Sequence, residues 1–255
     1  MSLYLKKFST HSEYDSYING SEAILPNVSL TVDNNTVHYN PYVDPCASEK
    51  VKTTYEWVEI GGVKWATKNV GALTVTDYGQ YFSWGGVNGF TADQVSGSCH
   101  SKAFSWADYE LGNGGSTAAD MTKYNSTDGK TVLEAADDAA TVNMGSGWRM
   151  PTTAEFAALG AAVNTAWTSD YQGSGVAGII CTDKTDSSKV LFFPAAGDCS
   201  NGSVSNVGSN GYYWSSSLST DNMIYGRYSN FFNGFVTWQS YNSRSFGFSV
   251  RGVVG

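Results

Sequence analysis

Gly211-Tyr212-Tyr213-Trp214-Ser215-Ser216-Ser217 and Gly247-Phe248-Ser249-Val250-Arg251 enclose the most informative stretch of this sequence. Between these two phrases, large aromatic rings are interspersed with Ser, Asn, Gly and Arg, and the chain has no Glu after Glu155 and no Lys after Lys189. Large amphipathic rings on small polar spacers are the composition of a recognition surface such as an antibody loop. A catalytic centre would need convergent titratable groups, which this stretch hardly has. The composition therefore favours binding over catalysis.

The bulk composition limits the class of protein and its partners. A chain of 255 residues can bury a real core, so its folding does not depend on disulfides. Few segments have helical periodicity, which favours a loop-rich α+β or mostly β fold. The net charge of −8 and the lack of a Lys/Arg cluster argue against a nucleic-acid partner. No apolar run is long enough to span a membrane, so no membrane insertion is expected. The first residues lack the apolar region of a signal peptide, which favours synthesis in a cytoplasm without obvious export.

Cysteines and acidic residues give no clear metal or catalytic motif. The cysteines stand at positions 46, 99, 181 and 199 without a Cys-x-x-Cys spacing, so a structural zinc site is not expected. Cys181 and Cys199 flank a predicted strand pair and could be bridged, although buried free thiols are the favoured interpretation. Asp137 and Asp138 are interpreted as a helix-capping or solvated pair. No catalytic residue and no cofactor are predicted, and calcium binding is left open because no loop has a recognisable ligand pattern.

Residues 1–50 differ from the rest and are interpreted as a separate attachment or oligomerisation segment. A capping-box pattern at Thr10 predicts a short helix to Ile18. Residues 23–30 and 36–40 predict two strands around a turn, and a Pro/Asp-rich linker follows at 41–45. A helix and one hairpin cannot bury enough surface to fold alone. We therefore expect this segment to contact a neighbouring subunit or to dock the protein onto something else.

Residues 51–255 are predicted to form one main domain of short strands, one or two helices and long loops. A helix is predicted from Thr152, which forms a capping box with Glu155. Its apolar face contains Phe156, Leu159, Val163 and Trp167. A second, short helix is predicted at 132–140 and an irregular loop at 85–129. The predicted strands are residues 55–60, 63–66, 176–182, 189–195, 211–217, 223–231, 235–239 and 247–253.

Two groups of motifs carry a resemblance to a known family. The first is Asp137-Asp138-Ala139-Ala140 followed by Gly147-Trp148-Arg149-Met150-Pro151-Thr152, and the second is the pair of phrases quoted at the start. Their order resembles the C-type lectin fold in its formylglycine-generating-enzyme-like branch. More narrowly, it is similar to the Fibrobacter succinogenes major paralogous domain and to the variable proteins of diversity-generating retroelements. The resemblance covers roughly residues 55 to 254. Met144 departs from it, since a Trp is expected there, but Met can fill an aromatic-sized gap.

This resemblance implies an α+β, C-type lectin-like fold with a variable region at about 215–251. In the family, a reverse transcriptase miscopies adenines, so that AAY codons diversify. Such codons cannot yield Lys, Glu, Gln, Met or Trp. Between Ser217 and Phe246, only Met223, Trp238 and Gln239 lie outside the accessible set. We expect these three to be fixed positions or to come from other codons.

The candidate ligand-binding face consists of positions expected to point outward between core-facing residues. Phe231, Val236, Phe248 and Val250 are predicted to lie in the core. The face is predicted to contain Leu218, Thr220, Asn222, Tyr225, Arg227, Tyr228, Ser229, Phe232, Asn233, Phe235, Thr237, Ser240, Tyr241, Asn242 and Ser243. Structural roles are predicted for Trp148, Arg149, Trp214 and Arg251. The guanidinium of Arg251 is expected to bind backbone carbonyls or a core carboxylate.

Three functions are compatible with the sequence. The leading one is a diversified host-recognition protein at the tip of a phage tail fibre, binding a protein or glycan on the bacterial surface. The opening segment resembles leaders of proteins from phages of Bacteroides-type bacteria, and it would contact other virion proteins. A homo-oligomer, preferably a trimer, would add avidity. The alternative is a bacterial surface or pilus-tip adhesin. A remote alternative is a formylglycine-generating oxidase, but that chemistry needs a late pair of reactive cysteines and none follows Cys199.

Overall fold

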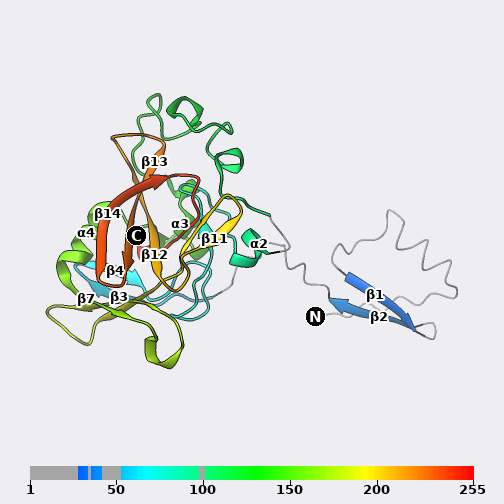
Figure 1. The fold of residues 1–255 in the computed structure, drawn as a ribbon, viewed down its shortest axis with the longest axis horizontal. Coiled ribbons are helices and arrows are strands. Elements are labelled where there is room, and N and C mark those ends of the chain that lie inside the picture. Colours follow the sequence, from blue (N-terminus) through cyan, green and yellow to red (C-terminus); the bar gives the residue numbers. More distant parts are fainter. Residues whose placement is uncertain (1–27, 34–35, 42–52, 98–100) are drawn as a thin grey trace. The chain divides into compact units, whose positions relative to one another are not determined.

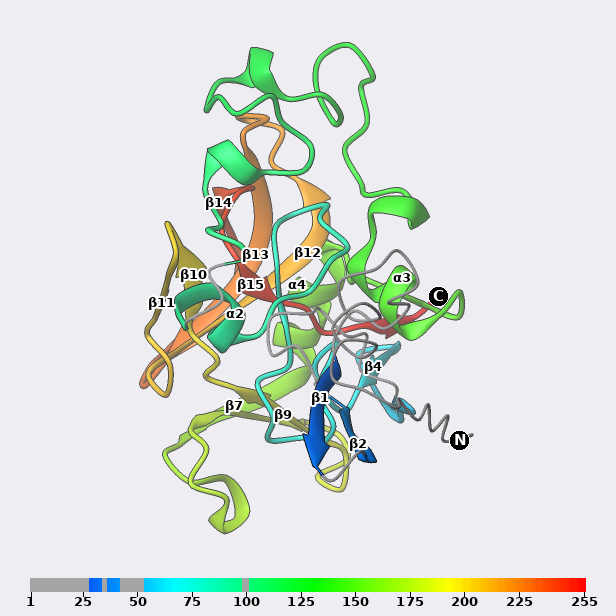
Figure 2. The ribbon, with the colours of Figure 1, turned by 90° about the vertical axis from the view of Figure 1, so that its right-hand side faces the viewer.

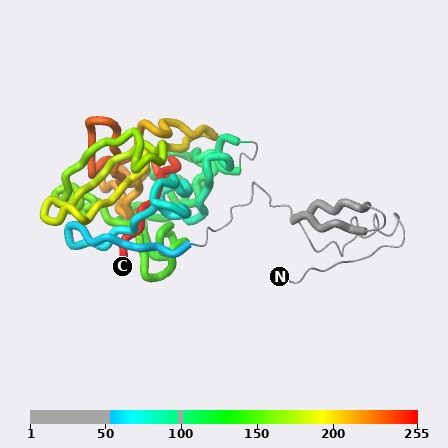
Figure 3. The backbone as a smooth tube through the Cα atoms, turned by 90° about the horizontal axis from the view of Figure 1, so that it is seen from below, coloured from blue at the N-terminus to red at the C-terminus, as the bar shows by residue number. Residues whose placement is uncertain are grey.

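The computed structural model describes residues 28–33, 36–41, 53–97 and 101–255 (Figure 1), and Figure 3 traces the last two ranges in colour. The chain divides into two compact units, Met1–Ala47 and Ser48–Gly255, and the predicted division at 50/51 lies close to this boundary. In the first unit, β1 (Val28–Asp33) pairs antiparallel with β2 (Thr36–Pro41). The predicted strand pair is therefore confirmed for the described residues, whereas residues 23–27 of the first predicted strand and residues 42–45 of the predicted linker lie outside them. The predicted helix at 10–18 lies outside the described residues.

A five-stranded sheet forms the centre of the second unit. Its strands are β5 (Tyr81–Phe82), β12 (Asn210–Leu218), β13 (Tyr225–Phe232), β14 (Phe235–Ser243) and β15 (Phe248–Ser249). Their order is β14-β13-β12-β15-β5, with β14 at one edge. The β12–β13 and β13–β14 pairs are antiparallel, whereas β12 and β15 are parallel. The aromatic stretch of the sequence therefore forms a continuous three-strand meander.

Three smaller sheets complete this unit. The first has the order β3-β4-β16-β6, built from β3 (Trp57–Ile60), β4 (Val63–Ala66), β6 (Trp148–Arg149) and β16 (Val253–Val254). The second contains β7 (Val163–Thr168), β8 (Gly178–Asp183) and β9 (Val190–Pro194), with β7 at an edge. The third pairs β10 (Asp198–Ser200) with β11 (Ser203–Ser205). The predicted class, mixed α+β with mostly antiparallel strands and few helices, is confirmed.

Three α-helices lie among these sheets in the described residues: α2 (Ala92–Ser96), α3 (Ala139–Met144) and α4 (Thr153–Ala162). The predicted capping box of α4 is confirmed, because Thr152 Oγ1 accepts from the Glu155 N–H at 3.2 Å and Glu155 Oε2 accepts from the Thr152 N–H at 2.7 Å. The loop-rich segment 101–138 lies beyond one end of β12 and β13 in both views (Figures 1 and 2). No described helix is long and apolar enough to cross a bilayer.

The structure corrects several predicted boundaries. The helix ends at Ala162, and Val163 and Trp167 belong to β7, because 163–168 pairs residue by residue with β8. The helix predicted at 132–140 is instead a short 3₁₀ turn, Ala135–Asp137, followed by α3, whose first turn is capped by Asp138. The single strand predicted at 247–253 is split into β15 and β16, which belong to different sheets.

Two hydrophobic clusters pack on opposite faces of the five-stranded sheet. Tyr213 and Phe231 belong to the cluster that also contains α4 residues and the β8 and β9 side chains. Trp214 and Tyr228 belong to the other cluster, with Phe248. Neighbouring residues enter different clusters because successive side chains of a strand point to opposite faces. The β12–β14 meander is thus buried in its middle on both faces, and its exposed residues lie toward its ends.

Two buried arginines tie distant segments together. Arg251 is fully buried and donates to Asn69 Oδ1 at 2.7 and 3.0 Å, to the Ala66 carbonyl at 3.0 Å and to the Phe192 carbonyl at 2.9 Å. Arg244 is also fully buried, and it donates to the carbonyls of Lys123 and Tyr124 in the long loop segment. Both cations therefore hold segments that are far apart in the sequence, Arg244 through backbone carbonyls and Arg251 through backbone carbonyls and the Asn69 side chain.

Candidate ligand-binding pocket at the β13–β14 hairpin

The β13–β14 hairpin brings two phenylalanines together at its turn. Phe232 and Phe235 pair directly across the two-residue turn Asn233-Gly234, where Gly234 has φ 82°, a conformation that favours Gly. Their rings stack at a centroid distance of 4.8 Å and an interplanar angle of 18°. They are 41% and 45% exposed, respectively. The turn therefore holds a rigid pair of rings in contact with water.

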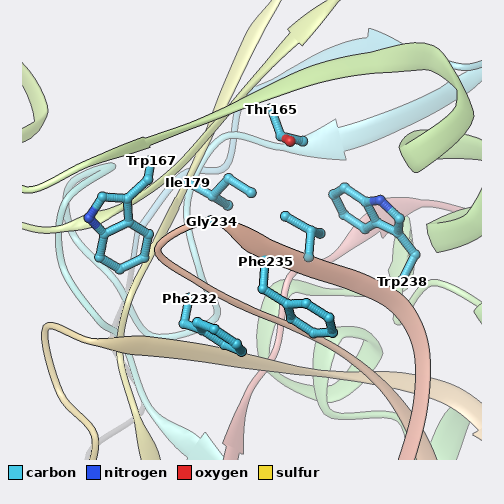
Figure 4. A pocket seen from close by; sticks show the side chains of 8 residues that line it. Thr165, Trp167, Ile179, Phe232, Gly234, Phe235 and Trp238 are labelled. Carbon is cyan, nitrogen blue, oxygen red and sulfur yellow. The ribbon is translucent and has the colours of Figure 1, made fainter.

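Beside this turn, a pocket of about 430 Å³ opens between the hairpin and the β7–β8 pair (Figure 4). Its lining residues are Thr165, Trp167, Ile179, Phe232, Gly234, Phe235, Val236 and Trp238. Trp167 and Trp238 stand on opposite sides of it, and their six-membered rings face each other across the opening (Figure 4). No lining residue carries an ionisable side chain. The pocket therefore offers aromatic and aliphatic walls without a charge.

Packing of fixed elements positions the two tryptophans. Trp167 contacts Phe231 at a centroid distance of 6.5 Å and pairs with Ile179 across the β7–β8 ladder. The Trp238 ring lies so close to α4 that a Cβ on Gly160 would be 2.2 Å from Trp238 Cδ1. The glycine thus leaves the space that this ring occupies. As a result, one wall of the pocket is set by β7 and β8 and the other by the contact between α4 and β14.

A second exposed group lies toward the other end of the hairpin. Tyr225 and Tyr241 approach each other at a centroid distance of 5.2 Å, and Tyr241 is 53% exposed. The guanidinium of Arg227 lies 5.5 Å from the Tyr241 ring and donates to Asp221 Oδ2 at 2.9 Å. We call these four residues the tyrosine cluster. It combines amphipathic rings with one paired cation.

The predicted binding face is only partly exposed. Among its members, those exposed are Thr220, Asn222, Phe232, Asn233, Phe235 and Tyr241, and those half-buried are Tyr225, Arg227, Thr237, Ser240, Asn242 and Ser243. Leu218, Tyr228 and Ser229 are buried, so the prediction that they point outward is wrong. Tyr228 packs on Trp214 and Phe248 in the core. The Ser229 hydroxyl is used inside the hairpin, where it donates to the Trp238 carbonyl.

The remaining members do not form one continuous face. Arg227 and Tyr241 are paired, and Phe232 and Phe235 are paired, so each pair shares a face. On β13, however, Phe232 lies five positions after Arg227, and an odd offset along a strand places the two pairs on opposite faces. A register shift between Tyr228 and Asn230 further changes which β14 residues oppose β13. The structure therefore contains two aromatic sites, the pocket and the tyrosine cluster.

Of the eight residues that line the pocket, only Phe232 and Phe235 belong to the predicted binding face. Thr165 and Ile179 lie outside the aromatic stretch, and Trp167 was assigned to a helix face. Trp238 was singled out only as a residue that an AAY codon cannot encode. The alternation of Val163, Thr165 and Trp167 is a strand signal that could have placed the last two on one face.

The residues predicted to be structural make interior or interstrand contacts. Trp214 is fully buried and its indole N–H donates to the Phe82 carbonyl at 2.9 Å. Trp148 is half-buried and packs edge-on against Tyr55 at 5.9 Å. Arg149 forms a two-point ion pair with Glu155, at 2.6 and 2.8 Å. The partners of Arg251 are two carbonyls and an amide oxygen, and no carboxylate pairs with it among the described residues.

Titratable groups do not gather near the pocket. Cys181 and Cys199 are free and buried, and burial raises the pKa of the Cys181 thiol to about 12 and that of Cys199 further above its ordinary value. Within the ranges that the structure describes, no group of three or more His, Cys, Asp or Glu side chains could hold a metal ion. No protein-family model, curated protein or solved structure matches this chain. A function for this chain must therefore be inferred from the side chains of the pocket and of the tyrosine cluster.

Proposed function

We propose that this chain is a ligand-binding protein whose contacts are made by aromatic residues at the ends of the β13–β14 hairpin. The observation that carries the proposal is the stacked pair Phe232 and Phe235, both more than 40% exposed at the mouth of an uncharged aromatic pocket. Concave apolar sites with few polar groups are typical of ligand pockets, and rigid aromatic anchors dominate binding energies. A ligand that covers the two rings would remove apolar area from water, which favours binding.

Two observations favour binding over catalysis. None of the pocket-lining residues can act as a general acid or base, since they are Thr, Gly, aliphatic or aromatic residues. The two described cysteines have raised pKa values because they are buried, and a thiol in that environment is a poor nucleophile. This disfavours the remote alternative, a formylglycine-generating-type oxidase, which would need reactive thiols.

The specific role that we propose is host recognition at the tip of a phage tail fibre, by a C-type lectin-like domain with a diversified surface. The motif order described above and the short antiparallel strands support such a fold. In this role residues 1–50 contact other virion proteins, and an oligomer, preferably a trimer, presents several copies of the pocket to a bacterial surface protein or glycan. The alternative is a bacterial surface or pilus-tip adhesin with the same domain.

Binding to bacterial cells tests the general proposal. Fluorescently labelled protein is expected to bind some strains in a panel of Bacteroides-type bacteria, and Phe235→Ser is expected to lower that binding at least tenfold. The matched control is Val207→Ser, because Val207 is also 45% exposed but does not line the pocket. Similar binding by both variants and the unmodified protein would contradict a role for the pocket.

Population sequencing tests the diversification. The gene and its flanks, sequenced from a population of the natural carrier, are expected to show substitutions confined to about 217–246, at template adenines. Substitutions spread evenly, with no template copy or reverse transcriptase nearby, would leave a fixed binding protein. Immunogold labelling would separate the two locations, since the proposed role predicts label at fibre tips and the alternative predicts label on cells.

A further inference from the structure

The pocket lies beside the edge strands of two different sheets. β14 is the outer strand of the five-stranded sheet and β7 is the outer strand of the three-stranded sheet, and both contribute lining residues. In the described part of the chain, no backbone–backbone hydrogen bond outside the strand ladders involves residues 235–242 or 164–168. Alternate N–H and C=O groups of an edge strand point away from its neighbour and can pair with another strand. The pocket is therefore bordered by unpaired backbone as well as by aromatic rings.

The walls also restrict the chemistry of a ligand. A charged group would lose its hydration without gaining a partner, because no lining side chain is ionisable. Thr165 provides the one side-chain hydroxyl of the lining, and the indole nitrogens of Trp167 and Trp238 lie at the ring edges away from the opening (Figure 4). The volume of about 430 Å³ is ample for a large side chain. An uncharged ligand that brings both an apolar group for the rings and hydrogen-bonding groups for the polar part of the lining fits this environment.

We propose that the pocket binds an extended segment of a protein ligand, which adds as a strand along the edge of β14 and places an apolar side chain between Trp167 and Trp238. This assignment rests on the proposed binding function and names its ligand class. Main-chain hydrogen bonds to an edge strand supply affinity, while pockets for alternate side chains supply specificity. The hairpin supplies the edge, and the tryptophans supply the pocket.

A protein ligand fits better than a sugar. A sugar ring could stack on the aromatic faces, but its hydroxyl groups do not repeat with the spacing of the N–H and C=O groups along a strand edge, whereas the backbone groups of an extended peptide do. An extended peptide instead presents its backbone groups to the strand edge and only an apolar side chain to the rings, so its polar groups find partners.

An array of random-sequence hexapeptides tests this ligand class on the full chain. Retained peptides are expected to alternate apolar and polar residues and to carry an uncharged large side chain. Thr165→Glu introduces a charge in the pocket lining and is expected to lower their affinity at least tenfold. Asn164→Glu is the matched control, because Asn164 is also exposed and its side chain points to the other face of β7. It is expected to leave the affinity within twofold.

Backbone methylation of a retained peptide tests the strand addition itself. Replacing single peptide N–H groups by N–CH₃ is expected to lower the affinity at least tenfold at alternate positions and hardly at the positions between them. A uniform response would overturn the strand addition, because side-chain binding alone does not depend on alternate N–H groups.

The outcomes separate this inference from the proposed function. If the protein binds glycans on an array and Thr165→Glu abolishes this binding, the peptide ligand would be overturned but the binding function would be kept. Binding to cells that is lost in Tyr241→Ala and unchanged in Thr165→Glu would likewise overturn the pocket assignment only. Absence of binding to peptides, glycans and the bacterial panel would overturn both.

Discussion

Single residues in this structure separate into those that hold the backbone and those that meet solvent, and Arg251 is the clearest of the first kind. Its guanidinium joins Ala66, Asn69 and Phe192, and its charge lies 4.4 Å from the Phe193 ring centroid. Burial lowers the pKa of Arg251 to about 10, because the charged form is desolvated. The buried guanidinium still stabilises the fold, because its planar group donates hydrogen bonds to several acceptors at fixed angles.

Arg251→Lys is expected to lower the free energy of unfolding by about 2–4 kcal/mol, because an ammonium cannot reproduce the four donated bonds and each bond to a charged group is worth about 1.5–3 kcal/mol. Urea denaturation monitored by tryptophan fluorescence measures the change. Arg227→Lys is the control, since Arg227 makes an exposed ion pair with Asp221 that is worth at most about 1 kcal/mol. Equal losses in the two variants would contradict this role of Arg251.

Glu155 predicts a pH dependence of stability. Burial tends to raise the pKa of Glu155, but hydrogen bonds from Arg149 and Thr152 outweigh burial and hold the pKa below its ordinary value. A carboxylate with a lowered folded-state pKa stabilises the protein fully above its unfolded pKa, near 4.3, and loses this contribution as the pH falls through the folded pKa. The stability difference between the protein and Glu155→Gln should therefore shrink between about pH 5 and pH 3. Urea titrations at each pH measure it, and a constant difference would argue against the prediction.

For single residues, the sequence predicted hydrogen-bond partners better than it predicted which side chains are exposed to solvent. The carbonyl partners expected for Arg251 are present, because an arginine in a nearly uncharged stretch must find acceptors. Tyr228 and Ser229 were expected to be exposed and are not, because a sheet with cores on both faces leaves no outward side in its middle. Single-strand alternation cannot show that a second core covers the other face.

At the scale of elements, the contact between α4 and β14 fixes the pocket. Gly160 faces the Trp238 ring, and any side chain at position 160 would occupy the same space. In an exposed helix, Gly→Ala usually adds about 1 kcal/mol of stability. In α4, the lack of a side chain at Gly160 leaves room for the Trp238 ring.

Gly160→Ala is expected to reverse the usual sign and to destabilise the protein by about 1–3 kcal/mol, because its methyl would overlap Trp238. Thermal and urea unfolding measure the effect. In the Trp238→Leu background the same substitution should cost less, which gives a non-additive double-mutant cycle. Gly147→Ala is the control, since a Cβ there meets no atom within 4 Å. Additive effects of the Gly160 and Trp238 changes would rule out the steric explanation.

Element boundaries show what local sequence can decide. The Thr152 and Glu155 capping box correctly placed the start of α4, because a cap depends on residues a few positions apart. The end of α4 was placed too late, because the 3.6-residue spacing of Phe156, Leu159 and Val163 continues into β7, whose state depends on pairing with β8. The pocket was invisible for the same reason, since it forms only where β7 and β14 meet.

For the whole molecule, all three described hydrophobic clusters lie within the second unit. A fragment of residues 48–255 is therefore expected to unfold within about 2 °C of the full chain, a shift that corresponds to less than about 1 kcal/mol. Differential scanning calorimetry of both proteins tests this expectation. A much larger decrease would show that residues 1–47 contribute to the stability of the second unit.

The position of β16 affects which translation products can fold around the aromatic stretch. Val253 pairs with both Trp65 and Arg149, so a two-residue strand that follows the aromatic stretch in sequence closes a sheet begun about two hundred residues earlier. A ribosome must therefore translate the whole stretch, in the correct reading frame, before this sheet and the Arg251 network can form. A stop codon or frameshift anywhere in codons 215–251 removes both. The aromatic stretch therefore cannot be part of a complete second unit unless the codons beyond it have also been read in frame.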